Sequence, residues 1–595
     1  MDISNLSIAT IRSLGIDTIN KANSGHPGMV LGSAPALYTL FNKELNIYNK
    51  EAEWINRDRF VLASGHASAL LYSMLHLTGF DVTIDDLKNF RQLNSHTPGH
   101  PEIEMTHGVD ASSGPLGQGI PMAAGMAMAE KFLASQYNKE NFDIIDHYTY
   151  VLCGDGDMQE GVTYEAASLA GHLSLGKLIV LYDANKVTLD GPLSMSFSEN
   201  VKKRYEACNW QVLEVKDGND INEIHKAIKK GKKEQFKPTL IIVNTVIGFG
   251  SANQGTNKVH GAPLGKEDGK NAKLSYGFDH DEFYVPEEVY EDFKKKTIKR
   301  GKSKFNKWNK LFNEYKEQYP TEAKQLEDAI AGKYSLNIDE LLKNYPVGHN
   351  DATRNTSLEV IQEVAKQNPT FLSGTADLAS STKTKIKDED DFSVENYNGR
   401  NLVFGIREFA MVAIMNGMTL HKGVKVSAGG FLVFSDYFKA AVRMACLMKL
   451  PIILPLSHDS IAVGEDGPTH QPIEQFAMLR SIPNMHVIRP GDAVEMAAAW
   501  KLAIESTENP TALILTRQNV ETMENSSVEG VSKGAYVIGK EENHLDAIII
   551  ASGSEVNLAM KAKKVLLEKG IDVRVVSMPC QEFFDQQDEQ YKEAV

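Results

Sequence analysis

The chain has 595 residues, with 63 Lys and Arg against 78 Asp and Glu, a formal net charge of −15 and four cysteines. At roughly 150 residues per domain, this length predicts three or four domains, each with an ample core. The acidic balance argues against a protein whose main task is to bind nucleic acid, because that task needs a basic surface. The four cysteines are far apart in sequence, which predicts neither a disulfide framework nor a CxxC metal pair.

The first 20 residues lack the basic start and the apolar block of a signal peptide. No apolar run approaches the roughly 18 residues that a membrane-spanning helix needs. We therefore expect a soluble cytoplasmic protein that has no membrane partner.

Short apolar runs alternate with longer amphipathic ones, a pattern that is typical of βαβ units with a mostly parallel sheet. Strands are expected at residues 148–153, 178–182, 240–243, 371–372, 401–404, 424–427, 452–456, 511–515, 547–551 and 573–577, and a helix at 160–173. The fold class is α/β, with three consecutive α/β domains. Their expected bounds are 1–320, 321–525 and 526–595, and the third domain is expected to be incomplete at its C-terminus.

Residues 286–345 are polar and poor in strand formers, which predicts peripheral helices and a connector. Nine of residues 294–310 are Lys or Arg, and Trp308 lies among them. Either a nucleic-acid patch or a solvated helix face could have this composition. The acidic remainder of the chain favours the solvated face, so no nucleic-acid partner is expected.

The sequence Gly154-Asp155-Gly156 follows a predicted strand and opens a helix. Three common motifs can be tested at this place, and each fails on one or two required residues. A dinucleotide fingerprint requires glycine at position 159, where this chain has Gln159. An EF-hand requires glycine and glutamate at the positions that Glu160 and Ala166 occupy. A P-loop over 171–178 requires Ser or Thr at the position of Leu178.

Asp155 ends one predicted strand, and Asn185 lies just past the end of the next. Both positions belong to the carboxyl edge of a parallel sheet, where α/β folds bind ligands. Two oxygen ligands there, with a loop carbonyl and diphosphate oxygens, suit Mg²⁺ or Ca²⁺. This spacing resembles that of the thiamine-diphosphate enzymes. The resemblance implies that Asp155, Asn185 and the carbonyl of Val187 hold the metal and that Gly156 approaches the diphosphate.

Histidine recurs beside glycine at His26, His66, His100 and His260. Zinc is an alternative ligand for such histidines, but their wide separation and the absence of nearby cysteines argue against it. Four such loops instead predict a site that hydrogen-bonds an oxygen-rich substrate and moves protons near neutral pH.

Further motifs lie at residues 114–119, 405–409, 431–434 and 458–472. Together with those above, they resemble the transketolase family, in the same order and from about residue 5 to the end of the chain. The resemblance assigns catalysis to Glu408, His26, His100, His260 and His470. It assigns the binding of thiamine diphosphate to His66, Gly114, Pro115, Leu116, Gly156, Asn185, His260, Asp377, Glu408 and Phe434. It assigns the sugar phosphate to His26, His260, Arg354, Ser381, His458, Asp466, His470 and Arg517.

Glu408 would hydrogen-bond the pyrimidine ring nitrogen, and Phe434 would stack on that ring. The implied reaction is the reversible transfer of a two-carbon ketol unit from a ketose phosphate to an aldose phosphate through a carbanion on the cofactor, in the pentose phosphate pathway. The family also implies a homodimer with active sites at the subunit interface.

Other readings stay open at this point. Another thiamine-diphosphate enzyme, such as a phosphoketolase, a dihydroxyacetone synthase or a deoxyxylulose-phosphate synthase, has related motifs. A cofactor-binding regulatory protein without catalysis is a different class, although the intact Asp155, Asn185 and Glu408 argue against it.

Overall fold

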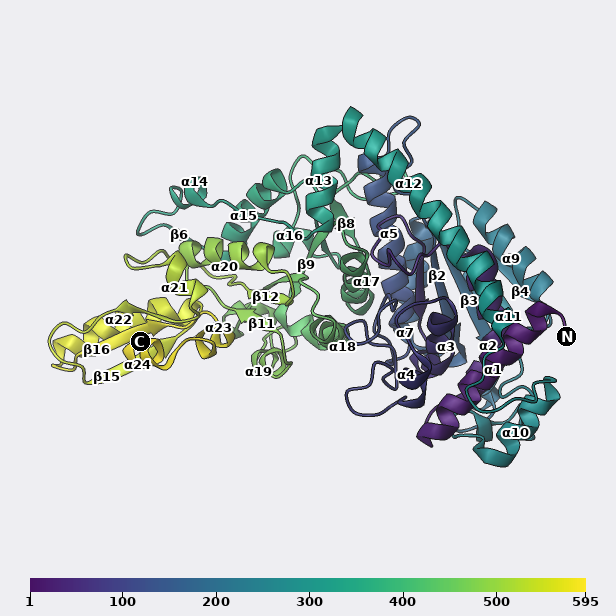
Figure 1. Ribbon diagram of the computed structural model, residues 1–595. Helices are drawn as coiled ribbons and strands as arrows, with labels where there is room; N and C mark the ends of the chain where they lie inside the picture. The colour runs from purple at the N-terminus through teal and green to yellow at the C-terminus, as the bar shows by residue number, and fades with distance from the viewer. The chain divides into compact units, whose positions relative to one another are not determined.

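The computed structural model describes residues 1–595, and the chain divides into two compact units, Met1–Lys324 and Gln325–Val595. Figure 1 shows the helices and strands of each unit along the chain. Both units have parallel sheets with helices packed against them, which confirms the expected α/β class.

The first unit contains a five-stranded sheet in the order β1-β2-β3-β5-β4, and every neighbouring pair is parallel. Its strands are β1 (Arg59–Leu62), β2 (Thr149–Gly154), β3 (Leu178–Ala184), β4 (Gln211–Val215) and β5 (Thr239–Asn244). The central strands β2 and β3 are mainly apolar and are buried along their whole length, because helices cover both faces of the sheet. Gly154 at the end of β2 pairs with Asp183 near the end of β3, so the loops after these strands meet at one edge.

The helices of the first unit are α1 (Ile3–Ala22), α2 (Pro27–Thr39), α3 (Ser68–Leu77), α4 (Ile84–Lys88), α5 (Gly119–Tyr137), α6 (Asp155–Gln159), α7 (Gly161–His172), α8 (Val201–Ala207), α9 (Ile221–Lys233), α10 (Gly265–Ser275), α11 (Glu287–Phe293) and α12 (Lys299–Gln318). Helix α13 (Pro320–Ile330) spans the boundary between the units. Helices α2 and α5 are largely buried around their circumference, whereas α9 buries one stripe and exposes Lys226, Lys229, Lys230 and Lys233.

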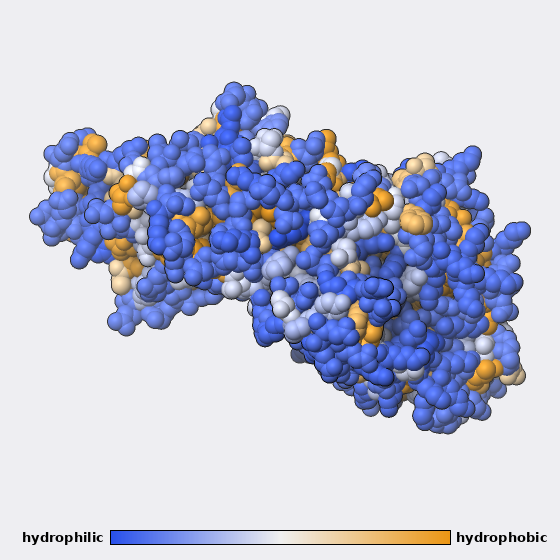
Figure 2. Space-filling model, turned by 90° about the horizontal axis from the view of Figure 1, so that it is seen from above, coloured by the Kyte–Doolittle hydropathy of each residue, from blue (hydrophilic) through white to orange (hydrophobic).

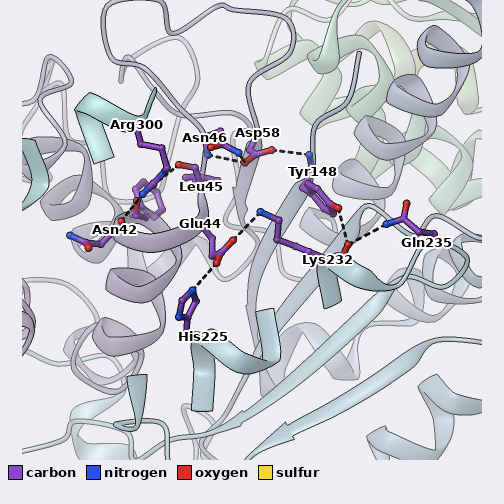
Figure 3. Close-up of polar contacts among 11 residues, drawn as sticks. Asn42, Glu44, Leu45, Asn46, Asp58, Tyr148, His225, Lys232, Gln235 and Arg300 are labelled. Carbon is purple, nitrogen blue, oxygen red and sulfur yellow. Dashed lines mark hydrogen bonds and ion pairs between the residues drawn. The ribbon is translucent and has the colours of Figure 1, made fainter. Parts of the chain in front are cut away.

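A polar network fastens helix α9 to the chain near the start of β2 (Figure 3). The carboxylate of Glu44 accepts hydrogen bonds from His225 Nε2 at 2.7 Å and from Lys232 Nζ at 2.9 Å. Burial alone would raise the pKa of Glu44, but the hydrogen bonds and charge of Lys232 and His225 hold it below its usual value. The hydroxyl of Tyr148 donates to the Lys232 carbonyl, and Asp58 accepts from the Tyr148 amide. The network lies at the amino end of β1 and β2, opposite to the carboxyl edge of the sheet.

The second unit begins with a six-stranded parallel sheet in the order β11-β12-β10-β9-β7-β8. Its strands are β7 (Phe371–Thr375), β8 (Asn401–Val403), β9 (Lys425–Phe431), β10 (Ile453–Ser457), β11 (His486–Ile488) and β12 (Thr511–Ile514), and a short antiparallel pair joins β6 (Asn350–Asp351) to β13 (Val520–Glu521). Its helices are α14 (Asp339–Leu342), α15 (Thr353–Gln367), α16 (Ala379–Thr382), α17 (Glu408–His421), α18 (Ser435–Leu447), α19 (Gln475–Arg480), α20 (Ala493–Glu505) and α21 (Val528–Ser532).

The last segment adds a three-stranded sheet of β14 (Tyr536–Gly539), β16 (Val573–Ser577) and β15 (Ala547–Ala551), with helices α22 (Ser554–Glu568), α23 (Gln581–Asp585) and α24 (Glu589–Ala594). Strand β16 is parallel to β15 and antiparallel to β14. The buried residues Ile538, Val575 and Cys580 belong to the same apolar core as Trp500 of α20. The three-stranded sheet is therefore packed onto the preceding parallel sheet through α20.

Strand β15 is an edge strand with exposed apolar side chains. Ile548 is 46% exposed and Ile550 is 59% exposed, and Leu558 on the adjacent helix α22 is 64% exposed. Figure 2 shows scattered hydrophobic patches on a mainly hydrophilic surface. Edge strands with apolar side chains are sites of strand pairing and aggregation. No helix of the chain has the length and apolar character of a membrane span.

The lysine-rich segment is helical, as expected, and Trp308 lies on the packed face of α12. Its indole nitrogen donates to the Ile144 carbonyl at 2.8 Å, and its ring contacts Trp54 and stacks on Phe312. The lysines Lys299, Lys302, Lys307 and Lys310 lie together on the other face. Strands β1, β4, β11 and β14 were not among the sequence predictions, because each is short or lies on the border of its sheet, where the apolar signal is weak.

Candidate active site

Asp155 lies where β2 ends and α6 begins. Its carboxylate is 3% exposed and accepts hydrogen bonds from the Tyr182 hydroxyl at 2.5 Å and from the Lys186 amide at 2.7 Å. Burial raises the pKa of Asp155 above its ordinary value, although both hydrogen bonds act in the opposite direction. A buried carboxylate that is held in one orientation at a strand end is suited to bind a cation.

Asn185 directly follows the last residue of β3, Ala184, at the same edge. Its side-chain nitrogen donates to Asp183 at 2.8 Å, and its Oδ1 accepts from the Val187 amide at 3.0 Å. Asp183 is buried and also accepts from Thr245, and burial raises its pKa to about 7. These contacts fix the orientation of the Asn185 amide.

The residues present fit a metal ion with a diphosphate. Asp155 and Asn185 offer hard oxygen atoms at one sheet edge, as Mg²⁺ and Ca²⁺ require. The chain has no cluster of three or more His, Cys, Asp or Glu side chains suited to a metal. A Cβ at Gly156 would lie 2.8 Å from Leu116 Cδ1, so a larger residue there would displace the Leu116 side chain.

The four predicted histidines of the first unit form one cluster. The ring centroid of His26 lies 5.1 Å from that of His66, 6.0 Å from His260 and 6.4 Å from His100, and His66 and His260 stack at 5.3 Å. His260 Nδ1 is buried without a hydrogen-bond partner, which marks a polar atom available to a ligand.

The histidines are neutral near pH 7. Burial, followed by the charge of Arg91, lowers the pKa of His26 to about 4, and burial lowers that of His66 to about 3. Burial also lowers the pKa values of His100 and His260. A neutral imidazole both donates and accepts a hydrogen bond, so the cluster can bind hydroxyl groups without repelling a nearby metal ion.

The loop 114–117 connects the histidine cluster to the Asp155 edge. A Cβ at Gly114, whose φ is +146°, would lie 3.3 Å from the His100 ring. Leu116 packs against Gly156, and the Gly117 amide donates to Asp157 at 2.9 Å. The predicted Pro115 lies between them in the sequence, as part of the same loop. The first unit therefore contains one continuous site.

Sequence reasoning missed two residues of this site. Asp157 is fully buried and accepts hydrogen bonds from Ser64, Gly117 and Gly154, so it joins the ends of β1 and β2 to the loop before α5. The sequence signal for Asp157 is that it is the second aspartate of the run Gly154-Asp155-Gly156-Asp157. Arg91 donates to Ser24 at 3.0 Å and lies 3.4 Å from His26 Nδ1, and no local motif announces it.

Glu408 and Phe434 lie in the second unit, each at the start of a helix. Glu408 is the first residue of α17, and Phe434 precedes α18. The Phe434 ring stacks on Phe431 at 5.8 Å and meets His470 edge-on at 5.3 Å. Asp377, with φ of +62°, lines a cavity of about 290 Å³ beside β7 and β8.

Cationic groups gather around His458. Its ring lies 3.8 Å from that of Phe431, its Nε2 lies 4.0 Å from Asp466, and its Nδ1 pairs with the Ser457 hydroxyl at 3.0 Å. Burial, then the charge of Arg354, lowers the pKa of His458 to about 4, and Arg517 acts in the same direction. Arg517 binds Glu465 at 2.5 Å and the Val463 carbonyl at 3.0 Å.

Arg354 donates to the Ser381 carbonyl at 3.2 Å, and its Nε is buried without a partner. Burial and the nearby Arg517 lower the pKa of Arg354. Two guanidinium groups held close together without a full set of acceptors are suited to an anion. The structure thus brings the predicted histidines of the first unit together, and in the second unit it places Phe434 beside His470, His458 near Asp466 and Arg354 beside Ser381. A cavity of about 900 Å³ between α1 and α10 contains none of them.

Comparisons with known proteins assign a class to each segment. Residues 3–335 match the model of the transketolase thiamine-diphosphate-binding domain, residues 350–523 that of the transketolase pyrimidine-binding domain, and residues 534–595 that of the transketolase-like C-terminal domain. The chain therefore contains the domains of a thiamine-diphosphate-dependent enzyme.

Full-length relatives give the family. A transketolase of Bacillus subtilis is 56% identical over 99% of this chain and 89% of its own length, and one of Staphylococcus aureus is 51% identical over 99% and 90%. Solved structures of transketolases from Pichia stipitis and Leishmania mexicana match with a TM-score of 0.97 at 46% and 43% identity, over 100% of this chain and 89% and 88% of theirs. The chain belongs to the transketolase family, thiamine-diphosphate-dependent transferases. The resemblance seen in the sequence is confirmed.

Proposed function

We propose that this chain catalyses the reversible transfer of a two-carbon ketol unit from a ketose phosphate to an aldose phosphate, using the residues of the two sites described above. Xylulose 5-phosphate is the proposed donor, and ribose 5-phosphate or erythrose 4-phosphate the acceptor. The observation that carries the proposal is the continuous site of the first unit, where loop 114–117 joins four neutral histidines to the Asp155 and Asn185 edge.

Asp155, Asn185 and the carbonyl of Val187 hold the divalent metal in this proposal, and Gly156 lets the backbone approach the diphosphate. Mg²⁺ and Ca²⁺ both suit this set, because all these ligands are oxygen atoms. Thiamine diphosphate, when bound, supplies the electron sink for the two-carbon unit. The surrounding pocket comprises His66, Gly114, Pro115, Leu116, His260, Asp377, Glu408 and Phe434.

Glu408 shares a proton with the pyrimidine ring nitrogen, and Phe434 stacks on that ring. Glu408 is half-buried at the first residue of α17, just after the exposed Ile406, and this position supports the role. The aromatic pair of Phe431 and Phe434 offers a flat apolar wall.

His26, His100, His260 and His470 bind sugar hydroxyls and hold or move their protons. The lowered pKa values of the first three support this role, since neutral imidazoles accept a proton from a hydroxyl at neutral pH. Asp466 binds one hydroxyl of the sugar.

Arg354, Ser381, His458 and Arg517 hold the phosphate of the sugar. The mutual charge effects of Arg354, Arg517 and His458 support one anion site. A transketolase of Pichia stipitis has been solved in complex with sedoheptulose 7-phosphate, and that chain is 46% identical to this one.

We also propose that the enzyme is a cytoplasmic homodimer with its active sites at the subunit interface, in the pentose phosphate pathway. Its domains run over residues 1–320, 321–525 and 526–595. Sedimentation of the purified chain tests the dimer.

The decisive experiment is a coupled assay with xylulose 5-phosphate and ribose 5-phosphate, with and without thiamine diphosphate and Mg²⁺. Formation of glyceraldehyde 3-phosphate that requires the cofactor supports the proposal. A folded dimer that binds the cofactor but forms no product would contradict it and would indicate a different substrate.

A further inference from the structure

The loop of residues 458–472, called the substrate loop from here on, carries three of the proposed substrate residues. It starts directly after β10 and ends shortly before α19. His458 lies at its beginning, in a left-handed conformation with φ of +61°, and Asp466 and His470 lie further along it. The affinity for the sugar phosphate therefore depends on what holds this loop in place.

One arginine contacts the start of the substrate loop and the helix that follows the loop. Arg489 follows strand β11, and its Nε and Nη2 donate to the Asp459 carboxylate at 3.0 and 2.6 Å. Asp459 is fully buried and is the immediate neighbour of His458. The same guanidinium lies 5.1 Å from the ring centroid of Phe476, in the helix α19 that follows the loop. Arg489 is thus a clamp across the base of the loop.

The C-terminal segment, from β14 to α24, also contacts the Arg489 guanidinium. Arg489 Nη1 donates to the Ser552 carbonyl at 3.2 Å and to the Glu555 carboxylate. The backbone is joined too, because the Arg489 amide donates to the Pro579 carbonyl at 2.8 Å and its carbonyl accepts from Gly553 at 3.1 Å. A Cβ at Gly553, whose φ is +60°, would lie 2.5 Å from Arg489 Nε. The turn at 552–555 is therefore shaped around the arginine side chain.

We propose that the C-terminal segment positions the substrate loop through Arg489, and that Arg489 and Glu555 are positioning residues for the sugar phosphate. This inference rests on the proposed function, in which His458, Asp466 and His470 bind the sugar phosphate. Arginine is required because its planar fork reaches Asp459, Ser552 and Glu555 at once, which the single ammonium group of lysine does not. The contact of Arg517 with Val463 and Glu465 is a second tie, in the middle of the loop.

The test uses the full chain with Glu555→Gln and Arg489→Lys. Glu555→Gln leaves the buried pair of Arg489 and Asp459 intact, so it keeps the test valid if the arginine variant does not fold. The matched control is Glu541→Gln, which weakens a similar ion pair of the C-terminal segment, with Arg574 at 2.8 and 2.9 Å. Neither Glu541 nor Arg574 lies in the substrate loop, and neither is a proposed binding residue.

Two readouts are measured. The first is KM and kcat for xylulose 5-phosphate, together with the affinity for thiamine diphosphate. The second is the rate at which a glutamate-specific protease cleaves after Glu465, whose side chain is 71% exposed, followed by mass spectrometry. A purely structural role would lower thermal stability and the active fraction, and hence kcat, without changing KM.

We expect both test variants to raise KM for xylulose 5-phosphate about tenfold, with kcat changed by less than about threefold, because small displacements of binding groups weaken ground-state binding. Cleavage after Glu465 should accelerate in both, while cofactor affinity and the Glu541→Gln control stay at the wild-type level. Unchanged KM and cleavage in folded Glu555→Gln and Arg489→Lys would overturn the inference, as would equal changes in the control. If the wild type transfers no ketol unit, the proposed function fails instead, and the cleavage rates still decide whether Arg489 holds the loop.

Discussion

The hydroxyl of Tyr182 donates a 2.5 Å hydrogen bond to the Asp155 carboxylate across neighbouring strands of one sheet. The two residues are 27 positions apart in sequence and meet because β2 and β3 are parallel and in register. The tyrosine fixes the carboxylate toward the site at the carboxyl edge. Partners of this kind orient the direct ligands of a metal.

Replacement of Asp155 by Ala should abolish cofactor-dependent activity, because the proposed metal loses its only charged protein ligand. Tyr182→Phe should weaken metal and cofactor affinity roughly tenfold, since it removes one orienting hydrogen bond. Calorimetric titration with Mg²⁺ and thiamine diphosphate measures both effects. Asp190→Asn, at an exposed residue of the neighbouring loop, is the control. Wild-type affinity in Asp155→Ala would refute the assigned metal site.

Glu408→Gln should lower kcat at least about a hundredfold while leaving the fold intact, because Gln cannot share a proton with the ring nitrogen. Steady-state kinetics and circular dichroism check the two parts of this expectation. Glu529→Gln is the matched control, since Glu529 also lies in the first turn of a helix in this unit but pairs only with Lys533 on the surface. Near-normal turnover in Glu408→Gln would show that another group moves the proton.

The histidine cluster should make the protein sensitive to acid. The pKa values of His26 and His66 in the folded state, about 4 and about 3, lie below the ordinary value of 6.5. The unfolded chain then binds more protons than the folded chain below pH 6.5, so stability falls as the pH drops from about 6.5 toward 4. His66→Gln should reduce this loss by up to about 2 kcal/mol between pH 7 and 4.5.

Urea unfolding at pH 7 and 4.5 provides the measurement, and the difference between variant and wild type isolates the contribution of His66. His96→Gln, at a side chain that is 63% exposed, serves as the control. An identical pH dependence in His66→Gln and wild type would show that this histidine does not cause the acid sensitivity.

Lys425 should destabilise the folded protein near neutral pH. Its ammonium group is buried and donates to the Ser506 carbonyl at 2.7 Å, and burial lowers its pKa to about 7. Because the folded pKa lies below the unfolded value of 10.5, the unfolded chain binds more protons between these values, and stability rises with pH from about 7 to 10. Lys425→Met should raise stability by about 1–2 kcal/mol at pH 7, after the lost hydrogen bond is subtracted.

Thermal unfolding at pH 6 and 9 measures this gain, which should be larger at pH 6. Lys564→Met, at an exposed position of α22, is the control. A gain that is independent of pH would mean that side-chain packing rather than the buried charge is responsible.

Several parts of this protein follow from its sequence alone. The sequence places Asp155 and Asn185 at one sheet edge, because each follows an apolar strand and parallel strands end at one edge, and the structure has both residues there. The four Gly-His motifs predicted histidines in loops, and the structure places their rings within 6.4 Å of at least one other. The α/β class followed from the alternation of apolar and amphipathic runs, which is a local property of the chain.

The tertiary structure decided which distant residues meet. Arg91 lies 65 positions from His26 in the sequence, and Arg489 lies 30 positions from Asp459 and 66 from Glu555. No local pattern at these residues predicts the contacts. Burial was also decided only by the fold, and burial sets the pKa values of His26 and Lys425. A sequence fixes the chemical type of each side chain and its local periodicity, whereas contacts and desolvation arise only when segments far apart in the chain pack together.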